Sequence, residues 1–188
     1  MKNQPPPSVC FMKEIKDKSF EVFISAEALA EQVAAVAELL NQEYAGKNPV
    51  FVSILNGSFI FTADLLRKIT IPCEISFIKV ASYHAMQSTG QVKNLIGLTE
   101  ELAGRDVVIL EDIVDTGITM EGILNALEAR NPASVRMAVL LFKAEALQRE
   151  ISPDYVCFRI PNRFVVGYGL DYDGYGRNLP DLYVLKEN

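Results

Sequence analysis

Short apolar runs alternate with amphipathic segments along most of the chain. Four runs are rich in β-branched residues and end at turn residues: 49–55, 75–81, 107–110 and 134–142. Runs of this kind are typical of strands buried on both faces of a parallel sheet. Helical patterns of apolar side chains lie between them, in residues 29–40, 59–66 and 119–130. The alternation predicts an α/β fold with a central, mostly parallel sheet flanked by helices.

The two ends of the chain carry weaker patterns. Residues 1–8 include three consecutive prolines, and we expect a flexible lead-in there. Residues 20–24 alternate like a strand, and residues 92–98 predict a further one. Between 154 and 170 the pattern favours two short strands joined at 160–162, consistent with a twisted edge hairpin. We expect one domain over the whole chain, because no repeat or second domain is visible.

The stretch from Asp106 to Glu121 (DVVILEDIVDTGITME) combines a buried strand with candidate chemistry. We expect its carboxylates, Glu111, Asp112 and Asp115, to lie in a turn between the strand and a helix that begins near Thr119. In open α/β sheets this carboxyl edge of the strands binds ligands. Backbone N–H groups and hydroxyls at a helix start suit a phosphate, whereas adjacent acids suit ribose hydroxyls or Mg²⁺. The plainer alternative is helix capping in a solvated turn.

Two further features fall at the ends of predicted strands. Residues 49–55 run into Asn56-Gly57-Ser58 and then a helix, which again places backbone N–H groups at the ligand edge. Lys143 ends the apolar run 134–142. Each has a simple alternative, since a short glycine turn is often punctuation and a lysine after a strand is usually solvated.

Composition narrows the class of protein. The chain has 188 residues, a formal net charge of −6, and 49% hydrophobic residues. An acidic chain argues against a nucleic-acid surface, which needs a basic patch. Its three cysteines lack zinc or disulfide spacing, which favours a reducing compartment. The N-terminus has no signal-peptide pattern and no apolar run is long enough for a bilayer, so we expect a cytoplasmic protein without a membrane partner.

The segment EDIVDTGIT at 111–119 closely resembles the ribose-phosphate signature of the type I phosphoribosyltransferases, in the form found in their hypoxanthine-guanine members. Matched motifs follow in the family's order over roughly residues 20–185. The segment LNGS at 55–58 resembles the pyrophosphate loop, which implies a cis peptide between Leu55 and Asn56. Asn56 departs from the family there, because a basic residue is usual at its position. The resemblance implies the type I fold, with a small base-binding hood to which residues 155–188 contribute.

The resemblance also implies a role for each matched residue. Asp115 handles a proton at purine N7, and Glu111 and Asp112 hold the ribose hydroxyls and Mg²⁺. The 5′-phosphate site comprises Asp115, Thr116, Gly117, Ile118 and Thr119, and the pyrophosphate site comprises Leu55, Asn56, Gly57 and Arg177. The base site comprises Lys143, Phe164, Val165 and Asp171, of which Lys143 contacts purine O6 and Asp171 also helps to hold Mg²⁺. Ser82 and Tyr83 begin a lid loop.

These assignments imply an enzyme of purine salvage. It transfers the phosphoribosyl group of phosphoribosyl pyrophosphate to a 6-oxopurine, hypoxanthine and also guanine, and it uses Mg²⁺. The Lys143 ammonium can only donate, which favours a 6-oxo group over the 6-amino group of adenine. Family membership also implies a homodimer or homotetramer. Two alternatives stay open: a xanthine-preferring relative, and a nucleotide-sensing regulator of the same fold.

Overall fold

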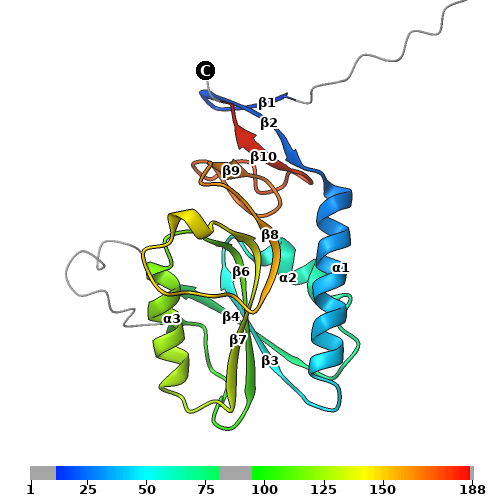
Figure 1. Ribbon diagram of the computed structural model, residues 1–188, viewed down its shortest axis with the longest axis vertical. Coiled ribbons are helices and arrows are strands. Elements are labelled where there is room, and N and C mark those ends of the chain that lie inside the picture. Colours follow the sequence, from blue (N-terminus) through cyan, green and yellow to red (C-terminus); the bar gives the residue numbers. More distant parts are fainter. Residues whose placement is uncertain (1–11, 81–94, 187–188) are drawn as a thin grey trace, which may run out of the picture.

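A six-stranded sheet forms the centre of the computed structural model, which describes residues 12–80 and 95–186 (Figure 1). Across the sheet the strands are β5 (Leu95–Ile96), β4 (Glu74–Val80), β3 (Val50–Leu55), β6 (Asp106–Val114), β7 (Ser134–Phe142) and β8 (Tyr155–Arg159). From β4 to β8 neighbouring strands are parallel, and β5 is antiparallel to β4. The predicted mostly parallel sheet is confirmed.

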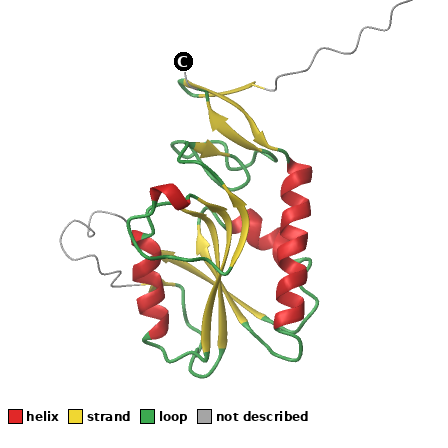
Figure 2. Ribbon diagram, viewed as in Figure 1, coloured by secondary structure: helices red, strands yellow, loops and turns green. Residues whose placement is uncertain are grey.

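Helices cover both faces of this sheet (Figure 2). α1 (Ala26–Glu43) and α2 (Phe59–Leu66) pack on the face that carries Phe51 and Leu110. α3 (Ile118–Glu128) packs on the other face, with Val52 and Ile109. Both faces of β3 and β6 are therefore buried, because successive side chains of a strand point to opposite sides. Ser25 caps α1 as predicted, and its hydroxyl accepts a hydrogen bond from the Ala28 N–H at 3.3 Å.

A second, four-stranded antiparallel sheet lies at one end of the large one (Figure 1). Its strands, in order, are β1 (Met12–Ile15), β2 (Lys18–Ile24), β10 (Leu182–Leu185) and β9 (Val165–Val166). Phe20, Val166 and Tyr183 form its small core. The sequence patterns missed β1 and β10. β8 and β9 are the two short strands expected between 154 and 170, but they belong to different sheets and form no hairpin.

The central stretch differs from its prediction in one respect. β6 continues to Val114, so Glu111 and Asp112 lie in the strand and not in a turn. The reason is tertiary, because the ladder with β7 continues through the pairs Glu111–Val139 and Val114–Phe142. Of the strand expected at 92–98, residues 92–94 lie outside the described residues and 95–96 form β5. None of the helices in the described ranges is long and apolar enough to cross a bilayer.

Candidate functional site

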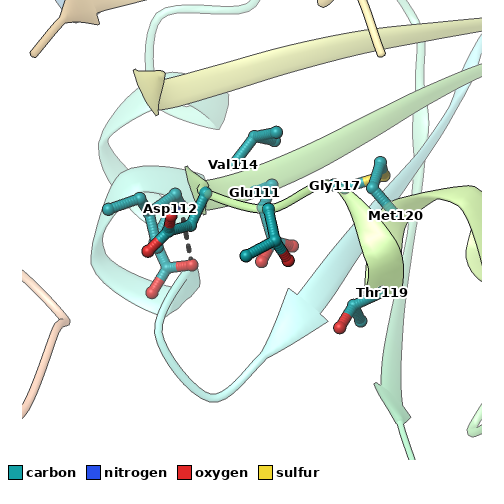
Figure 3. Close-up of a pocket in the computed structure, with 9 residues that line it drawn as sticks. Glu111, Asp112, Val114, Gly117, Thr119 and Met120 are labelled. Atoms are coloured by element: carbon teal, nitrogen blue, oxygen red, sulfur yellow. Dashed lines mark hydrogen bonds between the residues drawn. The ribbon is translucent and has the colours of Figure 1, made fainter. Parts of the chain in front are cut away.

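A cavity of about 340 Å³ opens where β6 ends and α3 begins (Figure 3). Its lining comes from one continuous stretch: Glu111, Asp112, Ile113, Val114, Asp115, Thr116, Gly117, Thr119 and Met120. Most of the predicted ribose and 5′-phosphate residues are therefore brought together here. Ile118, the first residue of α3, is not part of the lining. The cavity lies beyond the carboxyl end of β6, the edge at which open α/β sheets bind ligands.

Gly117 shapes the phosphate side of the cavity. Its φ of +78° is left-handed, so a side chain there would strain the backbone, and an added Cβ would lie only 3.0 Å from Ile151 Cγ1. As the N-cap residue of α3, Gly117 provides no side chain that caps the helix. The first-turn N–H groups can therefore turn to an anion, which the positive end of the helix dipole also favours.

Glu111 and Asp112 are two adjacent acids at the cavity wall. Glu111 is half-buried as a residue, yet its Oε2 atom is sealed from solvent and has no hydrogen-bond partner among the described residues. Burial, followed by the charge of Asp112, raises the pKa of Glu111 well above its ordinary value of 4.5. Burial also raises the pKa of Asp112, although a hydrogen bond from Glu111 and one from the Ile113 N–H (2.9 Å) oppose the rise. A buried carboxyl oxygen without a partner is a candidate ligand site.

Lys143 places a buried ammonium group beside Asp115, one of the residues that line the cavity. The residue is 6% exposed, and its Nζ lies 3.1 Å from Asp115 Oδ2. Its backbone N–H donates to the Val114 carbonyl at 3.0 Å, which fixes the start of the side chain against the end of β6. Asp115 is more open, with 45% of its side chain exposed. The pair therefore combines a solvent-reachable carboxylate with a donor-only ammonium.

Residues 55–58, the predicted pyrophosphate loop, contact the central stretch. The Leu55–Asn56 peptide is cis, as the family resemblance implied. A Cβ on Gly57 would lie 1.5 Å from Asp112 Oδ2, so the carboxylate occupies the space of the missing side chain. The pyrophosphate loop is thus packed directly against the acid pair.

The β9–β10 loop closes over the pyrophosphate loop from the other side. A Cβ on Gly169, whose φ is +105°, would lie 2.1 Å from the Gly57 carbonyl oxygen. Arg177 Nη1 donates to the Gly169 carbonyl at 2.6 Å, and Nη2 forms an ion pair with Asp171 Oδ1. The other Asp171 oxygen accepts from the Gly174 N–H at 2.7 Å. Sequence reasoning missed Gly169, although its place in a glycine- and aromatic-rich segment was a signal.

The predicted metal residues are not gathered into one group. Asp171 pairs with Arg177, apart from the cavity lined by Glu111 and Asp112. Within residues 12–80 and 95–186, no cluster of three or more His, Cys, Asp or Glu side chains is arranged to hold a metal ion. A Mg²⁺ ion at this site would therefore depend on substrate oxygens as well as on carboxylates.

The remaining predicted residues lie apart from the cavity lining. Phe164 is 44% exposed, and its ring packs edge-on against Tyr172 at 5.8 Å between centroids. Val165 is buried in β9, where it pairs with Val184. Among the described residues, neither Phe164 nor Val165 is part of the cavity lining. Ser82 and Tyr83, the predicted start of the lid loop, lie outside the described residues.

A mostly parallel sheet with helices on both faces is the fold of the type I phosphoribosyltransferases. The phosphoribosyl transferase domain family matches residues 24–173. The hypoxanthine-guanine phosphoribosyltransferase of Lactococcus lactis is 45% identical over 172 residues, which cover 90% of this chain and 93% of the relative. The enzyme of the same name from Streptococcus pneumoniae (strain R6) is 44% identical over 168 residues, with 89% and 93% covered.

Solved structures agree with these sequence relatives. A hypoxanthine phosphoribosyltransferase of Trypanosoma cruzi superposes with a TM-score of 0.82 at 36% identity, covering 93% of this chain and 95% of that one. A hypoxanthine-guanine phosphoribosyltransferase of Bacillus anthracis gives 0.80 at 33% identity, with 93% and 99% covered. The chain belongs to the phosphoribosyltransferase family and, within it, to the hypoxanthine-guanine group.

Proposed function

We propose that this chain is a purine-salvage enzyme that transfers the 5-phosphoribosyl group from phosphoribosyl pyrophosphate to a 6-oxopurine. A purine ring nitrogen forms a bond to ribose C1, the bond from C1 to pyrophosphate breaks, and a nucleoside monophosphate and pyrophosphate leave. The observation that carries the proposal is the cavity that unites the acid pair with the start of α3, together with the contact of Lys143 with Asp115 at the cavity wall. Hypoxanthine and guanine are the proposed bases.

The cavity has separate places for the two polar parts of a ribose phosphate. Asp115, Thr116, Gly117, Ile118 and Thr119 bind the 5′-phosphate, chiefly through the backbone N–H groups at the start of α3. Glu111 and Asp112 accept hydrogen bonds from the ribose hydroxyls. The unpartnered Oε2 of Glu111 supports this role, because a ribose hydroxyl would supply the donor that it lacks.

Asp115 and Lys143 act on the base. Asp115 accepts the proton that leaves purine N7 as the new bond forms, which its partial exposure allows. Lys143 donates to the 6-oxo group, because its ammonium has N–H donors beyond the one directed at Asp115. Phe164 stacks on the purine and the Val165 carbonyl faces the exocyclic position of the ring. The exposure of the Phe164 ring supports that assignment, since an occupied ring face must be accessible.

The pyrophosphate is held by Leu55, Asn56 and Gly57 together with Arg177. The contact of Gly169 with the Gly57 carbonyl supports this grouping, because it holds the Arg177 segment beside the loop. The donor set fits Mg²⁺, which binds oxygen ligands and often keeps only one or two carboxylates. Glu111 and Asp112, with Asp171, would hold the ion together with substrate oxygens. When bound, the ion neutralises charge on the departing pyrophosphate.

The wider setting is part of the proposal. Residues 1–188 form one phosphoribosyltransferase domain, to which residues 155–188 contribute the base-binding hood. We place the enzyme in the cytoplasm, as a homodimer or homotetramer without a nucleic-acid or membrane partner. The net charge of −6 supports the exclusion of nucleic acid.

Steady-state turnover with phosphoribosyl pyrophosphate and Mg²⁺ tests the function, with hypoxanthine, guanine, xanthine and adenine supplied separately. We expect turnover with hypoxanthine and guanine and none with adenine. Preferential use of xanthine would keep the reaction but contradict the proposed bases. Nucleotide binding without turnover on any base would contradict the enzyme and favour a nucleotide sensor.

A further inference from the structure

Three residues in and beside the predicted pyrophosphate loop carry buried hydroxyl groups. Ser53 of β3, Ser58 at the start of α2 and Thr62 of α2 are each no more than 1% exposed. Ser53 Oγ lies 2.7 Å from Ser58 Oγ and 2.7 Å from Thr62 Oγ1. Ser58 Oγ in turn lies 2.5 Å from the Ile54 carbonyl oxygen. A serine in the middle of an otherwise apolar buried strand costs free energy unless its hydroxyl is bonded, and here it is bonded twice.

The direction of these hydrogen bonds follows from their number. Ser58 has one hydroxyl proton, which it must donate to the Ile54 carbonyl, because a carbonyl only accepts. Ser58 therefore accepts from Ser53, and Ser53 accepts from Thr62. The result is a directional chain, Thr62 to Ser53 to Ser58 to the Ile54 carbonyl, in which every hydroxyl proton is used.

This chain has two consequences for the loop. It ties Ile54, just before the loop, to Ser58 at its end, so the base of the loop is closed by a side chain. It also uses the hydroxyl of Ser58. Ser58 occupies the N-cap position of α2 but makes no side-chain cap hydrogen bond. A serine at this position ordinarily accepts from an N–H of the first turn. Here Ser58 makes no such bond, and the Phe59 N–H donates instead to the Asn56 carbonyl within the loop at 3.4 Å.

From these contacts we infer that Ser53, Ser58 and Thr62 are positioning residues that hold the loop and the start of α2 ready for the pyrophosphate group. The three hydroxyls hold the two ends of the loop, while Asp112 and Gly169 lie against Gly57 within it. The inference rests on the proposed function only in naming pyrophosphate as the occupant. None of the three hydroxyls can donate to the ligand, because each donates its proton to another group of the protein.

Two variants test the inference: Ser58→Ala and Thr62→Val. Thr62→Ser, which keeps the hydroxyl, is the matched partner of Thr62→Val. Ser76→Ala is the control for a buried strand hydroxyl elsewhere, because Ser76 Oγ donates to Glu100 Oε2 at 2.6 Å on β4. The readouts are the KM values for phosphoribosyl pyrophosphate and for hypoxanthine, the Kd of pyrophosphate with Mg²⁺ by calorimetry, and the thermal midpoint.

Ser58→Ala should raise the KM for phosphoribosyl pyrophosphate and the Kd of pyrophosphate by about tenfold, with the KM for hypoxanthine almost unchanged. Thr62→Val should move the same two constants less, and Thr62→Ser and Ser76→Ala should leave them unchanged. A lower thermal midpoint with an unchanged pyrophosphate Kd would show a purely structural network and overturn the inference. Equal weakening of both substrates would overturn it as well.

The experiment separates this inference from the proposed function. If the wild type binds pyrophosphate but turns over no purine, the function fails, and the Kd shift of Ser58→Ala still decides the inference. If Ser58→Ala does not fold, the Thr62→Val and Thr62→Ser pair decides it.

Discussion

The two ends of the parallel sheet treat their charged groups in opposite ways. At the amino end, Glu74 at the start of β4 accepts from Arg105 at 2.7 Å and from Asn48 at 3.1 Å. Asp106 at the start of β6 accepts from Ser134 at 2.5 Å. At the carboxyl end of the same β6 strand, Glu111 Oε2 has no partner in the described part of the chain.

The contrast distinguishes polar groups that are paired within the fold from a polar group that is unpaired and available to a ligand. Carboxylates at the amino end are paired within the protein, which is the usual solution for a strand end. At the carboxyl end, Glu111 and Asp112 keep raised pKa values and Glu111 Oε2 is an unused acceptor, at a cost in stability that a bound substrate would offset. Matched residues from the two ends therefore allow a direct comparison by substitution.

The largest difference is expected between Asp115 and Asp154. Asp115→Asn removes the proposed proton acceptor and should lower kcat by about 10²–10⁴-fold. Asp154 lies at the amino end, where it accepts from Arg136 at 2.5 Å and from the Met137 N–H at 2.8 Å. Asp154→Asn should therefore lower the thermal midpoint and leave kcat unchanged. Near wild-type turnover in Asp115→Asn would refute the proton role.

Substitutions of glycines at the two ends should also differ in their effect on kcat/KM, by a smaller factor. Gly57→Ala places a methyl group where Asp112 Oδ2 lies, so kcat/KM for phosphoribosyl pyrophosphate should fall by about a hundredfold. Gly46, at the amino end before β3, has a φ of +75° and no described heavy atom within 4 Å of a Cβ. Gly46→Ala should cost about 1–2 kcal/mol of unfolding free energy through backbone strain alone and leave kcat/KM intact. Equal catalytic losses would contradict the difference between the ends.

Two lysines offer a comparison of base recognition. Lys143→Ala should raise the KM for hypoxanthine by about tenfold and weaken the rejection of adenine, because a buried charged donor is lost. Lys47, half exposed at the amino end, lies 3.8 Å from Asp106. Lys47→Ala should change neither constant, since exposed ion pairs contribute little. The measurement is KM for hypoxanthine together with kcat/KM for adenine. Unchanged values in Lys143→Ala would refute the 6-oxo contact.

The smallest expected effect is on the pH dependence of stability. The folded-state pKa of Glu111 lies above 4.5, so its contribution is fully present below that pH and is lost as the pH rises. Relative to wild type, Glu111→Gln should therefore gain unfolding free energy with rising pH, by no more than about 1.4 kcal/mol per pH unit. Urea unfolding between about pH 5 and pH 8 measures this gain.

Glu100 provides the control of opposite sign. The hydrogen bond from Ser76 lowers the pKa of Glu100, so its contribution is present above the ordinary value of 4.5 and is lost as the pH falls. Wild type should lose its advantage over Glu100→Gln only toward acid pH. A difference between Glu111→Gln and wild type that is flat with pH would contradict the raised pKa of Glu111.

Much of the site could be predicted because its residues are consecutive. Hydrophobic periodicity predicted β3, β6 and β7, and the segment 111–119 carries the acids, the phosphate turn and the helix start in one short run. Local chemistry dominates in such a run, since a helix start or a glycine turn depends on neighbouring residues. The misplacement of Glu111 and Asp112 in a turn arose because the β6–β7 ladder, a non-local contact, extends the strand through them.

The amino-acid sequence by itself determined the parallel α/β class, the family signature and most of the cavity-lining residues, but not Ile113, Val114 and Met120. The tertiary structure alone decided which distant segments meet there: Asp112 against Gly57, Gly57 against Gly169, and Lys143 beside Asp115. It also decided that Ser53, Ser58 and Thr62 share one hydrogen-bond chain. The physical reason is that periodicity records which face of an element is buried, whereas a contact between elements depends on how they pack in space.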